Sequence, residues 1–187
     1  MKKIVILGLL GFLGSLQAQV IIGDGVGTAP AASKGSVLLE FAAGQNKGII
    51  VPYVRTLPTT SPTRGTILLD ASTPTNARVK FYNGNTVTGT GGYVDLSGQP
   101  ADLRDALTAQ PTGIAERGKT IIGNQSTQVD GVLVLESDTK AMVLPTVSDV
   151  QNIVSPSPGM LVYVNKAGAK RLAVFNGAKW SFWQAAD

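Results

Sequence analysis

Glu40 and Glu136 are the two carboxylates whose surroundings most resemble those of a catalytic pair. Each follows a short run of valine and leucine, and two such carboxylates can serve as the acid and the base of a glycoside hydrolase. However, the two residues stand at matching places in two similar stretches, whereas the carboxylates of one active site have different roles. We therefore interpret both as structural, satisfied by backbone amides or by a nearby lysine, Lys47 or Lys140, because a buried carboxylate needs such partners.

Histidine and cysteine are both absent from the chain. Their absence excludes Ser-His-Asp and Cys-His nucleophilic machinery and removes the usual ligands of zinc and copper. Oxygen ligands for calcium remain, and Asp24, between Gly23 and Gly25, is the residue that could belong to a calcium loop. Because the acidic spacing of such a loop is missing, we favour a tight turn there. We predict neither a cofactor nor an enzymatic activity.

Aromatic side chains are the best candidates for binding another molecule. The faces of tryptophan and tyrosine can stack on sugar rings or anchor a protein interface. Alternation along a strand places Trp180 and Trp183 on opposite faces. Trp180 therefore fits a core position, whereas Trp183 is equally consistent with a core position and with an exposed site. The candidate binding residues are Trp183, Trp180, Tyr163, Tyr82 and Tyr93.

The chain repeats itself between residues 20–84 and residues 120–177. Landmarks recur in one order in the two stretches, which indicates an internal duplication of one unit. The repeat positions that we expect to be structural are Glu40, Glu136, Asn83, Gly84, Asn176 and Gly177. The paired landmarks are Ile21-Ile22-Gly23 with Ile121-Ile122-Gly123, Leu39-Glu40 with Leu135-Glu136, Pro52 with Pro145, Gly65 with Gly159, and 78–84 with 171–177.

Short runs of β-branched and aromatic residues, separated by Gly, Pro, Asn and Ser, predict an all-β fold of short antiparallel strands and hairpins. An Asn-Gly pair between two such runs is the strongest hairpin signal, because both central turn residues need a positive φ. Asn176-Gly177 therefore predicts a tight hairpin, whereas residues 86–92 delay the returning strand after Asn83-Gly84. The expected strands are 36–41, 48–54, 66–70, 78–82 and 93–96, then 131–136, 141–145, 160–164, 171–175 and 179–183.

One helix is predicted between the two stretches, over residues 101–110. Pro100 suits a first turn, and Asp102 and Asp105 lie near the positive end of the helix dipole. The apolar stripe of this helix contains Leu103, Ala106 and Leu107, and the residues that end it are Pro111-Thr112-Gly113.

This organisation predicts two tandem homologous β-domains, 19–98 and 113–187, joined by a short helical linker over 99–112. A second helical turn is expected over 148–154, with Ser148 as its cap.

Residues 1–18 have the layout of a secretory signal peptide. Lys2 and Lys3 precede an apolar run over 4–13, and small residues lead to a cleavage site after Ala18. The run is shorter than the about 20 residues that a membrane span needs, so a retained anchor is the less favoured alternative. Loss of the two lysines lowers the net charge from +4 to +2. The remaining basic residues are scattered and do not indicate a nucleic-acid partner.

Four phrases of the sequence resemble a pattern found in secreted repeat proteins of Bacteroidetes-type bacteria and in fibre-like proteins related to phage tail fibres. The resemblance spans most of the chain after residue 18, but Tyr53 stands where the pattern has arginine, and no tryptophan follows Asn83-Gly84. It implies an exported, surface-associated β-protein, often part of a fibre or adhesin, and it implies no activity. The phrases are Val26-Gly27-Thr28-Ala29-Pro30, Asn46-Lys47-Gly48-Ile49-Ile50-Val51-Pro52, Ser157-Pro158-Gly159-Met160-Leu161-Val162-Tyr163 and Phe175-Asn176-Gly177-Ala178-Lys179-Trp180.

We therefore predict an exported, non-enzymatic structural or adhesive protein of the cell surface, which is a subunit or accessory of a fibre or adhesin assembly. The extracellular space and the periplasm are the other compartments that export allows. Small β-units leave open sheet edges, so we expect a homo-oligomer, with a trimer or strand exchange as leading forms, or pairing with other surface proteins. The alternative function is a carbohydrate-binding module that uses exposed tryptophan and tyrosine. No membrane span is expected after signal removal.

Overall fold

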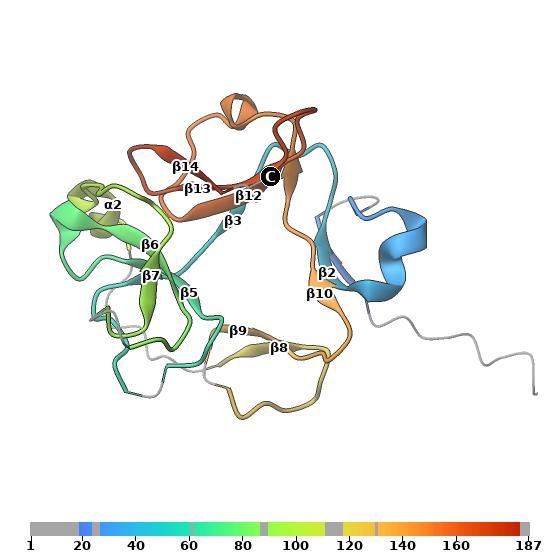
Figure 1. Ribbon diagram of the computed structural model, residues 1–187, viewed down its shortest axis with the longest axis horizontal. Helices are drawn as coiled ribbons and strands as arrows, with labels where there is room; N and C mark the ends of the chain where they lie inside the picture. Colours follow the sequence, from blue (N-terminus) through green and yellow to red (C-terminus); the bar gives the residue numbers. More distant parts are fainter. Residues whose placement is uncertain are drawn as a thin grey trace, which may run out of the picture.

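The chain is mostly β, with several small sheets and only short helices, as the sequence predicts (Figure 1). The expected signal peptide, Asp24 and the expected end of the helix at 111–113 lie outside the described residues. The computed structural model describes residues 19–23, 27–60, 62–86, 90–110, 118–129 and 131–183.

Short strands carry most of the described structure, and the helical elements are brief. The helical elements are η2 (Ala31–Ser36), η3 (Pro74–Asn76), α2 (Arg104–Thr108) and η4 (Val150–Asn152). The strands are β1 (Val20–Ile22), β2 (Val37–Phe41), β3 (Ile49–Ile50), β4 (Tyr53–Val54), β5 (Ile67–Asp70), β6 (Arg78–Tyr82), β7 (Tyr93–Asp95), β8 (Thr120–Ile122), β9 (Leu133–Leu135), β10 (Ala141–Met142), β11 (Thr146–Val147), β12 (Met160–Val164), β13 (Arg171–Phe175) and β14 (Trp180–Trp183).

Two four-strand arrangements in the chain have the same order and the same strand directions. In β4-β5-β6-β7 and in β11-β12-β13-β14, the first pair is parallel and the next two pairs are antiparallel. The Leu69 N–H donates to the Pro52 carbonyl, and the Tyr163 N–H donates to the Pro145 carbonyl, both at 2.9 Å. Pro52 divides the strand expected over 48–54 into β3 and β4, because proline has no N–H with which to continue a ladder. The strand expected over 141–145 is only β10, and β11 follows Pro145.

Two further sheets contain only parallel strands, which differs from the antiparallel fold predicted for the chain, and their strands β1 and β8 were not among the expected ones. One sheet has the order β1-β2-β10, and the other pairs β8 with β9. A parallel pair needs a crossover connection, whereas an antiparallel pair can be joined by a tight turn. The connection from β1 to β2 is a crossover of this kind and contains η2. Local alternation of apolar residues does not distinguish the two directions.

Strands from the two similar stretches also pair with each other. β3, from the first stretch, is antiparallel to β12, so that Ile50 lies opposite Met160. β10, from the second stretch, is parallel to β2, so that Met142 lies opposite Leu39. The two stretches are therefore joined through sheet edges as well as through the segment between them.

The main hydrophobic core contains residues of both four-strand arrangements. Leu161 and Val174 of the second arrangement pack in one cluster with Leu69 and Val79 of the first. A second cluster, around the fully buried Val162, lies on the other side of β12 and β13. The main core therefore links the two sheets through one face of β12 and β13.

The expected helix over 101–110 is shorter than predicted, because α2 contains only residues 104–108. Its predicted apolar stripe is confirmed: Leu103 and Leu107 are buried in the main core, and Ala106 packs against it. This segment is therefore packed into the core that both sheets share.

The predicted cap of the second helical turn is wrong by one residue. Asp149, not Ser148, is the N-cap of η4, and its carboxylate accepts the Gln151 N–H at 3.2 Å. The Ser148 hydroxyl instead accepts a hydrogen bond from the Asn152 side chain at 2.8 Å. A carboxylate is an equally good N-cap, so the sequence alone could not choose between the two neighbours.

Candidate trimerisation region

Each four-strand arrangement carries an aromatic pair at the same place in its ladder. Tyr82 lies opposite Tyr93 with ring centroids 5.0 Å apart, and Phe175 lies opposite Trp180 with centroids 5.2 Å apart. Such pairs contribute about 0.5–1.5 kcal/mol beyond their burial. Trp180 also packs against the second core cluster. Three of the five candidate binding residues are therefore engaged in contacts within the fold.

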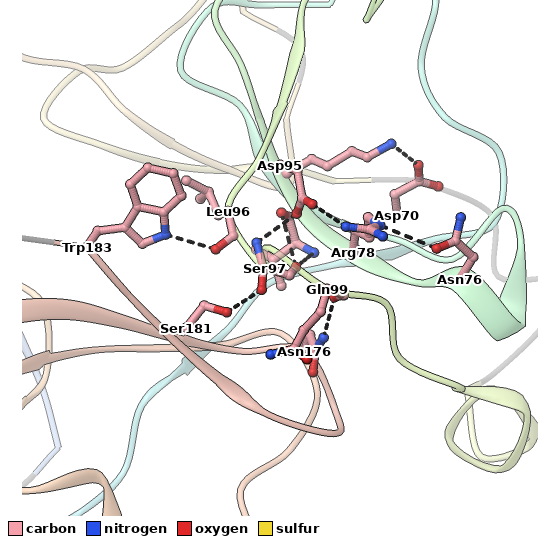
Figure 2. Close-up of polar contacts among 12 residues, drawn as sticks. Asp70, Asn76, Arg78, Asp95, Leu96, Ser97, Gln99, Asn176, Ser181 and Trp183 are labelled. Carbon is pink, nitrogen blue, oxygen red and sulfur yellow. Dashed lines mark hydrogen bonds and ion pairs between the residues drawn. The ribbon is translucent and has the colours of Figure 1, made fainter.

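Trp183 is attached to the other sheet through its indole nitrogen, although 43% of the residue is exposed (Figure 2). The side chains of Asn176 and Ser181, in the same β13–β14 hairpin, also donate hydrogen bonds to backbone carbonyls of the segment after β7. These bonds fix the second sheet against the first. The donors and acceptors are Trp183 Nε1 to the Leu96 carbonyl at 2.8 Å, Asn176 Nδ2 to the Gln99 carbonyl at 2.7 Å, and the Ser181 hydroxyl to the Ser97 carbonyl.

Asn176 and Gly177 form a tight turn, but its centre is shifted by one residue from the predicted centre. The Asn176 N–H donates to the Lys179 carbonyl at 3.2 Å, so the two central residues are Gly177 and Ala178. Gly177 has a φ of 109°, whereas Asn176 does not have a positive φ. The fully buried Asn176 side chain instead accepts the N–H groups of Ala178 and Lys179, both at 2.9 Å. Asn176 therefore stabilises the turn with its side chain.

Asn83 and Gly84 repeat part of this arrangement in the first sheet. The Asn83 side chain accepts the Asn85 N–H at 2.8 Å, and Gly84 has a φ of 76°. The Asn83 N–H donates to the Gly92 carbonyl at 2.9 Å, so the ladder resumes only after the long loop. The delayed return of the strand agrees with the prediction for this loop.

Glu40 is fully buried on β2 and accepts three hydrogen bonds. The donors are the Ala29 N–H at 2.8 Å, Lys34 Nζ at 3.0 Å, and the Gln19 side-chain amide. Gly27 lies directly against the carboxylate, since a Cβ there would come within 1.9 Å of Glu40 Cδ. The carboxylate therefore organises the connection between β1 and β2.

The predicted lysine partners of the two glutamates are wrong. Glu40 pairs with Lys34 instead of Lys47, because η2 folds back over β2. Glu136 is half-buried and accepts a hydrogen bond from the Thr127 hydroxyl, and Lys140 is not its ion-pair partner. The structural interpretation requires hydrogen-bond donors for both carboxylates, and both have them, although the donors are not the predicted lysines.

The two glutamates also differ in their place relative to the strand pairs. Glu40 comes one residue before the residue that lies opposite Ile22 in its strand pair. Glu136 comes one residue after the residue that lies opposite Ile122. The sequence match of Leu-Glu with Leu-Glu is therefore offset by two residues in the structure. The positions opposite these isoleucines are Phe41 and Leu135.

Asp70 and Lys80 form a half-buried ion pair across β5 and β6, with 2.7 Å between the carboxylate and Nζ. Burial by itself raises the pKa of the Asp70 carboxyl. Hydrogen bonds from Lys80 and Ser72 outweigh burial and hold the pKa below its ordinary value of 3.8. The charged form of Asp70 is therefore the form that the fold favours.

Acid is expected to weaken the fold partly through Asp70. Because its folded pKa lies below the unfolded value, the stabilisation is present above 3.8 and is lost as the pH falls through the folded pKa. Asp70→Asn should therefore reduce the loss of stability on acidification, measured as the urea midpoint at several pH values. Lys80→Met is the matched variant and should lower stability at neutral pH. An acid dependence that Asp70→Asn leaves unchanged would contradict this assignment.

β8 and β9 form a two-strand ribbon, which we call the β8–β9 ribbon (residues 120–122 and 133–135). It lies at the bottom of Figure 1, apart from β12, β13 and β14 at the top. Val134 is buried, but Leu133 and the preceding Val132 are 47% and 69% exposed. Parallel sheets are normally covered on both faces. The ribbon therefore presents an uncovered apolar surface in a single chain.

In the part of the chain that the structure describes, no group of three or more acidic side chains is placed to hold a metal ion. No helix in the same part of the chain is both long enough and apolar enough to cross a membrane.

Comparison with known proteins finds a similarity in the last third of the chain. Residues 121–186 match the family model of the phage tail like trimerisation region. This part of the chain, which begins within β8 and runs past β14, is therefore similar to a phage tail-like trimerisation region. No curated protein and no solved structure matches the chain.

Proposed function

We propose that the chain is an exported, non-enzymatic structural protein of the cell surface, which works as a homotrimeric subunit of a fibre or adhesin. The observation that carries this proposal is the match of residues 121–186 to a trimerisation region. Such a region implies a structural role. The layout of residues 1–18 supports export.

The β8–β9 ribbon supports assembly of copies at this end of the chain. The exposed Leu133 of the ribbon and the exposed Val132 before it lie inside the matched region. Three ribbons around a common axis would bury these side chains, at about 25 cal/mol per Å² of apolar surface removed from water. Closed symmetry also lets every copy use the same surface.

The repeated strand order supports an origin by duplication. We propose two related units, 19–98 and 113–187, with 99–112 between them. Both carry a proline-linked parallel pair followed by two antiparallel pairs. Repetition of a small β-unit is a common way to build an elongated protein.

Glycan binding has less support as an alternative. Tyr163 and Trp183 share a cross-strand row through Leu172, and the partly exposed Trp183 ring could stack on a sugar. However, the Trp183 indole N–H already bonds to Leu96. Its attachment to the first sheet gives Trp183 a role in the fold that needs no ligand.

The purified protein is expected to have three times the mass of one chain by size-exclusion chromatography with light scattering. Leu133→Asp should dissociate it, because the new carboxylate would be buried without a partner between ribbons. Val154→Asp is the matched control: Val154 is 89% exposed, also lies within the matched region, and should leave the trimer intact. A wild-type protein that elutes as a monomer at every concentration would overturn the proposal.

A further inference from the structure

β5 and β12 occupy the same place in the two four-strand arrangements, but only β12 has a complete set of neighbours. One edge of β12 meets β13, and its other edge meets β3 at Met160–Leu161 and β11 at Tyr163–Val164. One edge of β5 meets β6, and its other edge meets only β4, at Leu69–Asp70. Among the described residues, no strand lies beside Thr66 and Ile67, where the counterpart of β3 would be.

The backbone of Ile67 faces this open edge. The Leu69 N–H donates to Pro52 on the same edge, and Ile67, two residues earlier, directs its N–H and carbonyl to the same side. Ile67 is also 36% exposed. An edge of this kind is a template for another strand.

The glycines that precede β12 and β5 also indicate that a neighbouring segment is present beside β12 and missing beside β5. A Cβ on Gly159, before β12, would lie 3.1 Å from Val51 Cγ2, because the segment that contains β3 is packed there. A Cβ on Gly65, before β5, would meet nothing within 4 Å. Both glycines have a positive φ, 75° at Gly159 and 89° at Gly65. Each N–H donates to the carbonyl of the last residue of the following strand, Phe175 in β13 or Tyr82 in β6. The space that Val51 and Tyr53 occupy beside Gly159 is therefore open beside Gly65.

We propose that the edge of β5 at Thr66–Ile67 receives residues 142–144 of a second copy of this chain, as an antiparallel strand. This inference rests on the proposed homotrimer and names the strands that would join its subunits. The segment 142–147 reads Met-Val-Leu-Pro-Thr-Val, and its counterpart 49–54 reads Ile-Ile-Val-Pro-Tyr-Val. The second segment already provides the strand, β3, that fills the equivalent edge of β12.

The segment 142–144 is available for this pairing in its own chain. β10 is the last strand of the β1-β2-β10 sheet, so one of its edges is open. The Val143 N–H donates to Leu39 at 2.8 Å, which directs the backbone groups of Met142 away from β2. Leu144 is half-buried, whereas its counterpart Val51 is only 7% exposed. Pairing with another copy would give Leu144 the cover that Val51 has.

The pairing begins at residue 142 and not before it. Gly48 lies one residue before β3, and a Cβ there would come within 2.7 Å of the Leu161 carbonyl oxygen. Ala141, its counterpart, carries that Cβ, so the contact is limited to 142–144 with 65–67. Two different surfaces meet in this contact, and such an arrangement closes into a ring when three copies are related by a three-fold axis.

Engineered cysteines test this pairing, because the chain contains no cysteine of its own. The Ile50–Met160 pair corresponds to Val143–Thr66. Ile50 and Met160 form a non-hydrogen-bonded pair of the antiparallel ladder, in which the two residues exchange no backbone hydrogen bonds. Positions of this type bring Cα atoms to about 4.5 Å, within the range for a disulfide. Thr66→Cys with Val143→Cys should therefore form covalent dimers and trimers under mild oxidation, seen on a non-reducing gel.

Matched variants separate the possible results. Ile50→Cys with Met160→Cys should form a disulfide inside one chain, and each single cysteine variant should stay uncoupled. A protein that is trimeric by light scattering but gives no linked chains in the Thr66→Cys/Val143→Cys variant would overturn the strand pairing and leave the homotrimer intact. A disulfide within one chain of that variant would also overturn the pairing. A monomeric wild type would overturn both proposals.

Discussion

Replacement of Glu40 by alanine is expected to lower the free energy of unfolding by about 3–4 kcal/mol. The carboxylate is fully buried, and its loss leaves the Ala29 N–H and the Lys34 ammonium without their acceptor. The connection that contains η2 would then lose its attachment to β2. Urea unfolding of the purified variant, followed by tryptophan fluorescence, measures the loss.

Glu136→Ala is the matched control for this prediction. Glu136 is half-buried and accepts one hydrogen bond, from Thr127, so its replacement should cost about 1 kcal/mol or less. Equal losses in the two variants would contradict the distinct environments described above. They would favour the equivalence of the two glutamates that the sequence predicts.

Replacement of Gly123 by alanine is expected to lower the free energy of unfolding by about 3 kcal/mol. About 1–2 kcal/mol comes from the positive φ, which is 101° at this residue. The remainder comes from overpacking, since the new Cβ would lie 2.1 Å from the Glu136 carbonyl oxygen, and such insertions cost about 1–3 kcal/mol. The clash would separate β8 from β9, so the variant should also form less trimer.

Gly118→Ala isolates the steric part of this effect. Gly118 has a similar φ of 113°, but a Cβ there would meet nothing within 4 Å. This variant should lose about 1–2 kcal/mol through backbone strain alone and should stay trimeric. If thermal unfolding shows the same loss for both variants, the close approach of Gly123 to Glu136 is wrong.

Local features of the sequence predicted the parts of the fold that depend on near neighbours. The apolar stripe Leu103, Ala106 and Leu107 lies in the core as its spacing indicates. Asn176-Gly177 marks a turn, although the side chain of Asn176 contributes more than its backbone angle. These signals lie within a few residues of the structure that they specify.

Pairings between distant strands could not be predicted in this way. β3 with β12 and β10 with β2 join segments whose local patterns give no partner and no direction. The same limit explains the glutamate partners: Lys34 reaches Glu40 only because η2 folds back over β2, whereas Lys47 was nearly as close in sequence. The attachment of Trp183 to Leu96 likewise depends on how the two sheets pack.

Native mass spectrometry of the purified wild-type protein tests the central claim, that residues 121–186 assemble three copies of the chain. The expected result is one dominant species with the mass of three identical chains, which persists when the protein is diluted. A dominant species of one chain or of two chains at every concentration would contradict the account.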